Sequence, residues 1–501
     1  MQKYVKAKKE IKAKSLTLYF NYTFLFSSFN LESLVNKIGS EDELNGTISL
    51  TLNLPTESIK IFSEEGKFYK EKIFDHYLAP FLYLKMSYIE ISHSILNDQN
   101  EEYYLGKWIP NKEDIDDYTK SSTKINYIKR KIFLMESGQG TECIEVNCTP
   151  PVGKLFSSLD IVYLSNIGMR RRKFKKDKMN RQFSEYKLIK HDSEFFLFDF
   201  FFEDITNLKN CLNTIVSSNE NIEKSDDVKF KWIETDSKYK LAGDVIKYKS
   251  NLHFQDPFPV ISVTVSDDIY ADCFLDEDQR KAMYKKKTMK IPKLFESSKS
   301  SMNKELLMLI YMSKLQFFQD ISFAIDSNII KDYKLVNMCS NSAVFLHLYS
   351  RSGLIVRTEN AFLINHAEYI IPAFIETIQY LRMRWHAYVV ASQWLEKIIE
   401  YLAGDKTAFS SVLKMIIDSR RVISGALSDP LAYRIGSGSM NKIYGLGLNI
   451  FRIPELQNIV IEKFSWIETL YNNIFQMERV NKIELLDEEL RKLKKQSTDN
   501  V

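Results

Sequence analysis

The apolar residues near the N-terminus recur with a period of two. From Leu16 to Phe26 they alternate with residues that mostly carry hydroxyl or amide groups. A strand turns successive side chains to opposite faces, so this period predicts a half-buried strand within residues 15–31. The segment is uncharged and follows the basic stretch KAKKEIKAK, as a secretory signal or a membrane span would. Its polar groups and the lack of a small-residue cleavage site argue against both, so we predict no membrane span.

Several further segments have the pattern of strands. The runs 131–136 and 141–147 flank Ser-Gly-Gln-Gly, which predicts a hairpin. Residues 67–97 have instead a helical pattern that Pro80 interrupts. Together the strands predict a mixed or antiparallel sheet. Its other members are expected at residues 48–54, 194–202 and 257–266, and in two short runs within 332–358.

From about residue 302 the apolar spacing lengthens to that of helices. The most regular pattern runs from Phe374 to Leu402 in steps of four and three residues, with Ser392 as its polar member. This heptad seam predicts a helix over 366–402. Further seams predict helices over 407–427 and 454–495. Helices joined by short turns favour antiparallel neighbours, so we predict an antiparallel helical bundle that ends in a coiled-coil-like helix.

The length of the chain predicts more than one domain, because 501 residues exceed what one ordinary core accommodates. We predict an α+β domain at 1–150, a second α+β segment at 151–300 that can join the first, and a mainly helical domain at 301–501. The five cysteines are odd in number and widely spread. Without a signal peptide they indicate reduced thiols in the cytoplasm.

The stretch 436–447 holds four of the 16 glycines. It lacks the Gly-Lys-Ser/Thr end of a phosphate-binding loop, and no predicted strand precedes it. Since it lies between two predicted helices, we interpret it as a flexible turn or hinge.

One dense run of basic residues indicates a polyanion surface. The net charge is only +4, so such a preference must come from local clustering. The run can neutralise several phosphates while Phe174 stacks on a base. The alternative is a solvated surface that balances acidic loops elsewhere. The basic residues are Arg170, Arg171, Arg172, Lys173, Lys175, Lys176, Lys178 and Arg181.

A loop rich in carboxylates follows the predicted strand at 260–265. Strand-end carboxylates hold divalent metal ions in many nucleases and phosphotransferases, so Asp267, Asp268 and Asp272 are candidate metal ligands. Their spacing matches no established pattern, and a solvated acidic surface is the alternative. The seven histidines are isolated in the sequence. We assign no catalytic residue, and the sequence identifies no cofactor.

The predicted helices carry aromatic residues of the kind that dominates protein interfaces. The candidates are Trp385, Tyr388, Trp394 and Trp466. Apolar seams more often form the core of a bundle, which is the alternative. The tail at 484–495 has many charges and few apolar residues, so a partner or a second copy would stabilise it. We therefore expect a protein partner or self-association through helices 366–402 and 454–495.

These features favour a non-enzymatic binding or assembly protein that is a component of a larger complex. Its α+β part would bind nucleic acid or another polyanion, and its helices would mediate association. The alternative is a metal-dependent nuclease or phosphoesterase that uses the carboxylates after 260–265. The amino-acid composition, rich in Lys, Asn and Ile, is typical of a protein from an AT-rich microbial genome. A role in a defence or mobile-element system is therefore a further hypothesis.

Replacing six residues of the basic run by Ser tests the polyanion surface. We expect wild-type chain to bind labelled DNA and RNA with an affinity that falls steeply with salt, because phosphate contacts release counterions. The variant should not bind. Fluorescence anisotropy at low and moderate salt measures both, and equal, negligible binding by the two proteins contradicts the prediction. The six residues are Arg170, Arg171, Arg172, Lys173, Lys175 and Lys176.

Overall fold

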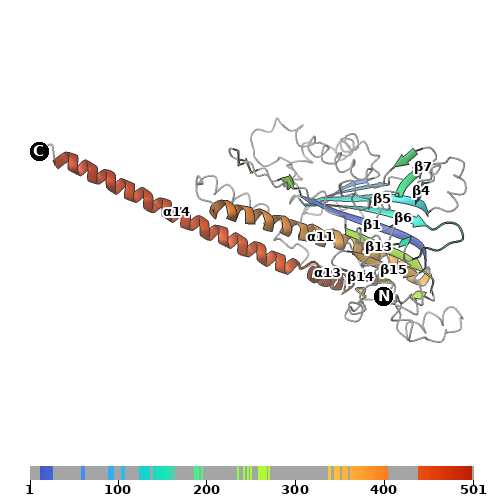
Figure 1. Ribbon diagram of the computed structural model, residues 1–501. Helices are drawn as coiled ribbons and strands as arrows, with labels where there is room; N and C mark the ends of the chain where they lie inside the picture. Colours follow the sequence, from blue (N-terminus) through green and yellow to red (C-terminus); the bar gives the residue numbers. More distant parts are fainter. Residues whose placement is uncertain are drawn as a thin grey trace, which may run out of the picture. The chain divides into compact units, whose positions relative to one another are not determined.

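The computed structural model of the chain describes a mixed sheet and three helices (Figure 1). The described residues are 12–25, 58–62, 88–94, 103–107, 123–135, 139–157, 160–161, 164, 186–190, 193–195, 234–235, 241–242, 245–246, 249–250, 258–267, 269–270, 337–339, 344–349, 352–358, 361–403 and 438–498.

The sheet combines strands that are far apart in the sequence. Its order is β14-β15-β13-β1-β6-β5-β4-β7-β8, with β3 also on β5 and β2 on β3. All neighbouring strands are antiparallel except β13 and β15, which are parallel, so the sheet is mixed. The predicted α+β class is confirmed. The strands are β1 (Ala13–Leu25), β2 (Ser58–Phe62), β3 (Tyr88–Ser94), β4 (Tyr103–Lys107), β5 (Thr123–Met135), β6 (Gln139–Thr149), β7 (Tyr186–Lys190), β8 (Ser193–Phe195), β13 (Phe258–Val265), β14 (Phe345–Leu348) and β15 (Gly353–Thr358).

The alternating N-terminal segment is a strand, as predicted. β1 lies between β13 and β6, and its Leu18 pairs with Ile261 on one side and Val146 on the other. The strand expected at 48–54 lies outside the described residues, and only the start of that expected at 194–202 is described, within β8. In the described part of the chain, no helix is long and apolar enough to cross a membrane.

The hairpin prediction is confirmed, whereas part of one predicted helix is wrong. β5 and β6 pair as antiparallel neighbours, with Ile132 opposite Glu142. Within the segment 67–97, expected to be helical, residues 88–94 form strand β3, which pairs with both β5 and β2. The β-branched Ile89 and Ile91 suit a paired strand, and this tertiary pairing outweighs the helical pattern.

Three helices are described: α11 (Ala361–Ala403), α13 (Gly438–Ile450) and α14 (Ile453–Thr498). α11 and α14 confirm the helices predicted at 366–402 and 454–495, and the helix predicted at 407–427 lies outside the described residues. α13 corrects the interpretation of 436–447 as a flexible turn, since residues 438–450 are helical despite their glycines. Arg452, whose φ of 55° is left-handed, lies between α13 and α14.

The chain divides into two compact units. The first comprises residues 1–236, 249–383 and 430–451, and the second comprises 237–248, 384–429 and 452–501. The first unit contains the sheet, α13 and α11 up to Met383. The second contains the rest of α11 together with α14.

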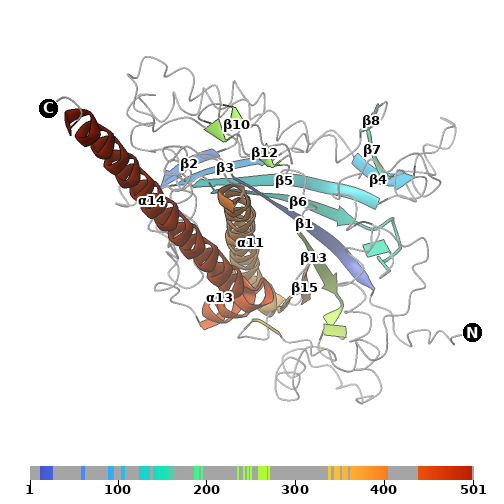
Figure 2. The same cartoon turned by 60° about the vertical axis from the view of Figure 1, so that its left-hand side comes forward.

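Within the first unit, α11 covers one face of the sheet (Figure 2). On this face a Cβ atom added at Gly353 of β15 would lie 3.6 Å from Ile378 of α11. The opposite face of the central strands is apolar and fully buried, at Leu18, Ile144 and Ile261 for example. That face also buries an ion pair between Arg130 and Glu142.

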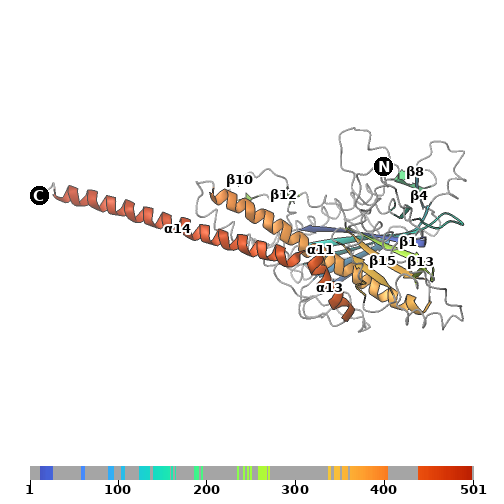
Figure 3. The same cartoon turned by 60° about the horizontal axis from the view of Figure 1, so that its bottom comes forward.

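α13 approaches α11 closely at a glycine (Figure 3). A Cβ atom added at Gly447 would lie 2.3 Å from the Cδ1 atom of the buried Leu381. Two residues away, a Cβ at Gly445 would meet no atom within 4 Å. Close packing therefore requires glycine at 447 and leaves 445 free to change.

These two glycines form a matched pair of tests. Gly447→Ala is expected to destabilise the protein by up to about 2 kcal/mol, since overpacking of the buried Leu381 outweighs the gain in helix propensity. Gly445→Ala should stabilise it by about 0.5–1 kcal/mol through propensity alone. Urea unfolding followed by circular dichroism measures both, and equal midpoints for the two variants would show that the close approach is absent.

Candidate functional site: buried charges and an exposed helix

Most of the predicted ligand-binding residues lie outside the described part of the chain. This holds for the whole basic run, Arg170 to Arg181, and for Asp268 and Asp272. Asp267 is described: it follows β13, and its carboxylate accepts a hydrogen bond from the hydroxyl of Thr358 at the end of β15. Among the described residues, no group of three or more His, Cys, Asp or Glu side chains is placed to hold a metal ion. The polyanion surface and the metal site stay predictions.

The four aromatic residues proposed for an interface have different surroundings. Tyr388 is fully buried, and its hydroxyl accepts a hydrogen bond of 2.9 Å from Arg384. Trp385 is half-buried, and the side chain of Trp394 lies outside the described set. Trp466 on α14 is 66% exposed. Of these four, Trp466 is therefore the one whose described position leaves it open to a partner.

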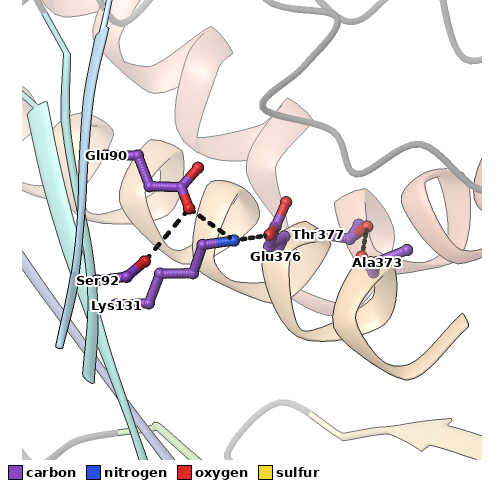
Figure 4. A network of polar contacts seen from close by, with 6 residues as sticks. All are labelled: Glu90, Ser92, Lys131, Ala373, Glu376 and Thr377. Carbon is purple, nitrogen blue, oxygen red and sulfur yellow. Dashed lines mark hydrogen bonds and ion pairs between the residues drawn. The ribbon is translucent and has the colours of Figure 1, made fainter. Parts of the chain in front are cut away.

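A cluster of three charged side chains joins α11 to the sheet (Figure 4). Lys131 of β5 donates to Glu376 of α11, and its Nζ lies 3.4 Å from Oε1 of Glu90 on β3. The hydroxyl of Ser92 donates to the same Glu90 oxygen at 3.4 Å. Glu376 is buried, while the Lys131 side chain is 36% exposed. One cation on β5 thus holds two carboxylates, one from strand β3 and one from helix α11.

Burial and charge shift the pKa values of this cluster. Burial raises the pKa of the Glu376 carboxyl, and the ion pair with Lys131 offsets only part of that shift. Burial alone would lower the pKa of Lys131, but the two carboxylates outweigh it and raise that pKa above its ordinary value. Lys131 is therefore a cation at neutral pH and unsuited to act as a nucleophile. The cluster acts as an anchor for α11.

A cation of α11, the guanidinium of Arg382, is held by aromatic rings. The guanidinium of Arg382 lies 5.2 Å from the ring centre of Phe258 and 5.8 Å from that of Phe451. The two rings meet edge to face, 5.4 Å apart. Burial lowers the pKa of Arg382 to about 10, which leaves it charged at neutral pH. Such cation–π contacts stabilise a desolvated cation by roughly 2 kcal/mol.

Polar side chains also cross the sheet on the face that carries Lys131. Burial, reinforced by Glu145, raises the pKa of the Tyr127 phenol, so this group stays a hydrogen-bond donor. The bonds link five adjacent strands and hold them laterally. They run from Arg357 Nε to Thr264 (3.0 Å), from Ser15 to Thr264 (2.8 Å), from Asn147 to Thr17 (2.8 Å) and from Tyr127 to Glu145 (2.7 Å).

In the second unit, the first part of α14 is anchored to α11. Lys463 Nζ donates to the backbone oxygen of Ser392 at 3.2 Å and to Glu396 at 3.3 Å. Val460 and Ile467, one heptad apart, are fully buried. Ile474, one heptad further, is half-buried. The packed side of α14 therefore follows the sequence seam up to this point.

The second part of α14 has no buried side chain among its described residues. From Arg479 to Lys492 every residue is exposed. Five of them are large and apolar, with exposed fractions between 51% and 61%: Val480, Ile483, Leu485, Leu486 and Leu490. Single exposed apolar residues are ordinary, but a concentration of them on one helical segment marks an interaction site. We take this segment, 479–492, as the candidate functional site.

The sequence carried a partial signal for this site. Its low apolar content and high charge predicted a helix in need of a partner, and residues 484–495 overlap the segment. The candidate list nevertheless missed Ile483, Leu486 and Leu490, because it ranked Trp and Tyr above aliphatic residues. The interval between successive apolar residues was the signal that could have found them.

Lys131→Met tests the anchor of α11. At pH 7 it should cost about 1–3 kcal/mol of unfolding free energy, because two carboxylates lose their shared cation and partial exposure moderates the loss. A carboxyl with a raised folded pKa costs stability only as pH rises above its unfolded pKa, about 4.5. The loss in Lys131→Met should therefore grow between pH 4 and pH 7 in urea titrations.

Two further variants make this test specific. Lys129→Met removes an exposed cation from the same strand and should cost less than about 1 kcal/mol, since its described contact is with the Tyr127 ring. Adding Glu376→Leu to Lys131→Met should recover much of the loss, because no buried carboxylate then remains on α11. A Lys131→Met loss that is the same at pH 4 and pH 7 would contradict the anchor.

Comparison with known proteins assigns no functional residue to this chain. No family model matches it, and no curated protein or solved structure matches it significantly.

Proposed function

We propose that this protein is a non-enzymatic assembly protein that docks through the segment 479–492 of α14, as a component of a larger complex. The exposure of the large apolar side chains of Ile483, Leu486 and Leu490 on one helical segment carries the proposal. The helical part would act as an antiparallel bundle, with the C-terminal part of α14 contributing a coiled-coil interface to a partner helix.

Residues 479–492 would need a partner because an unsupported helix is only marginally stable. An isolated helix of this length gains little from propensity alone and depends on tertiary packing of an apolar face. Residues 479–492 carry that apolar face without burying it. A partner helix would bury Ile483, Leu486 and Leu490, at roughly 1.5–3 kcal/mol for each side chain fully removed from water.

A basic surface at Arg170–Arg181 would add polyanion binding to this assembly role. Its support is the density of positive charge in the sequence. The alternative enzyme would use Asp267, Asp268 and Asp272. The hydrogen bond from Thr358 to Asp267 favours a structural use of that carboxylate, so docking is the preferred function.

Substituting the apolar segment tests docking in native cells. A tagged full-length chain should co-purify with a defined set of proteins, which can include untagged copies of itself. Leu486→Asp combined with Leu490→Asp should lower that recovery at least about tenfold, because charges cannot be buried in an apolar contact. Quantitative mass spectrometry of the purified material measures the recovery.

Leu485→Asp is the matched control, because Leu485 is as exposed as its neighbour Leu486 but points about 100° away around the helix. It should leave recovery unchanged. Equal recovery with wild type and with the Leu486→Asp, Leu490→Asp variant would refute docking through this segment.

A further inference from the structure

Three exposed apolar residues of α14, namely Ile483, Leu486 and Leu490, do not continue its packed side. The packed side repeats every seven residues at Val460, Ile467 and Ile474. Its next positions, seven and eleven residues beyond Ile474, are Asn481 and Leu485, and both are exposed. Nine residues separate Ile474 from Ile483, and at about 100° per residue these two side chains point in roughly opposite directions.

A second seam therefore starts at Ile483. Ile483, Leu486, Leu490 and Leu493 follow in steps of three, four and three, which places them at positions a, d, a and d of two heptads. The first three are 52%, 58% and 54% exposed. Because this seam faces away from the packed side, a straight helix bound along Val460 and Ile467 cannot cover it.

The residues beside this seam alternate in charge. In the same register Lys482 and Glu489 occupy position g, and Asp487 and Lys494 occupy position e. Position g of one helix pairs with position e of a parallel partner five residues later. Two copies in parallel would thus pair Lys482 with Asp487 and Glu489 with Lys494. Both pairs are of opposite sign, so the segment is complementary to itself.

Antiparallel copies would also be matched in charge. There position g faces g and position e faces e, which pairs Lys482 with Glu489 and Asp487 with Lys494. No like-charged pair arises in either orientation. A partner of unrelated sequence would need to reproduce this pattern, whereas a second copy has it by necessity.

We infer that the occupant of the seam Ile483-Leu486-Leu490-Leu493 is the same segment of a second copy of this chain, which forms a two-stranded coiled coil. This inference rests on the proposed docking function and names its partner. The seam spans only two heptads, so the dimer is reversible and dissociates on dilution through the micromolar range.

Sedimentation velocity on the purified full-length chain tests the inference. At tens of micromolar the wild type should sediment as a species of twice the 58.7 kDa of one chain. Leu486→Asp should raise the dissociation constant at least about tenfold, since it places a charge in a d layer of each copy. Leu485→Asp, at position c, should dimerise as the wild type does.

Charge exchange at positions g and e gives a second, independent readout. Glu489→Lys should weaken the dimer about three- to tenfold, because each copy then presents like charges to the other. Adding Lys494→Glu restores a parallel dimer, in which the two positions face each other. The same addition weakens an antiparallel dimer further, since the introduced lysine would face Lys482 and the introduced glutamate would face Asp487. Restoration and further weakening of the dimer both support pairing with a second copy, and which of the two occurs shows whether the helices are parallel or antiparallel.

Three outcomes would overturn the inference. They are a monomer at every concentration, a dimer unaffected by Leu486→Asp, and a dimer indifferent to both charge variants. If the purified chain is monomeric but co-purification from native cells still depends on Leu486 and Leu490, docking stands and the second copy is wrong. If neither depends on these residues, the proposed function fails as well.

Discussion

The burial of α11 constrains the rest of the first unit. Nearly every described side chain from Ile370 to Met383 is buried, although this stretch includes Glu376 and Arg382. A buried charge without a partner costs several kcal/mol, so each charged residue restricts what packs against it. The carboxylate of Glu376 requires Lys131, and a slip of one residue in β5 would turn Lys131 to the opposite face. The position of the helix and the register of the sheet therefore depend on each other.

Short-range patterns in the sequence correctly predicted those helices and strands that neighbouring residues are enough to specify. The alternation in β1, the Ser-Gly-Gln-Gly stretch that follows β5 in the sequence, and the heptads of α11 are each patterns of residues that lie close together in the sequence. The two errors arose where distant residues decide. β3 is a strand because β5 and β2 pair with it. α13 is a helix although its glycines lower its propensity, and Gly447 is the residue that lets it approach Leu381. The anchor of α11 was equally invisible, since Lys131 and Glu376 are 245 residues apart.

The candidate site shows a different limit of sequence reasoning. Tyr388 and Trp466 are both large aromatic residues on heptad helices, yet one is fully buried and the other is 66% exposed. Residue type does not distinguish a core from an interface, because both favour aromatic side chains. The phase of the apolar repeat does carry this information. The change from Ile474 to Ile483 was present in the sequence, but its meaning required knowing which side of α14 is packed.

The apolar repeat of α14 changes phase along the helix, and this change separates its contact with α11 from the proposed contact of its tail. A single uninterrupted seam would let one partner helix cover α14 from end to end, and the contact within the unit would extend into the tail. The half-turn between Ile474 and Ile483 prevents this, so the tail keeps an apolar side that Lys463 and its neighbours do not use. Two heptads bury too little surface for tight association on their own. In the proposed complex, other contacts would raise the effective concentration of the two tails, and a weak seam would then pair readily. A short, charge-matched seam thus allows pairing that depends on assembly, which a longer apolar seam would make permanent.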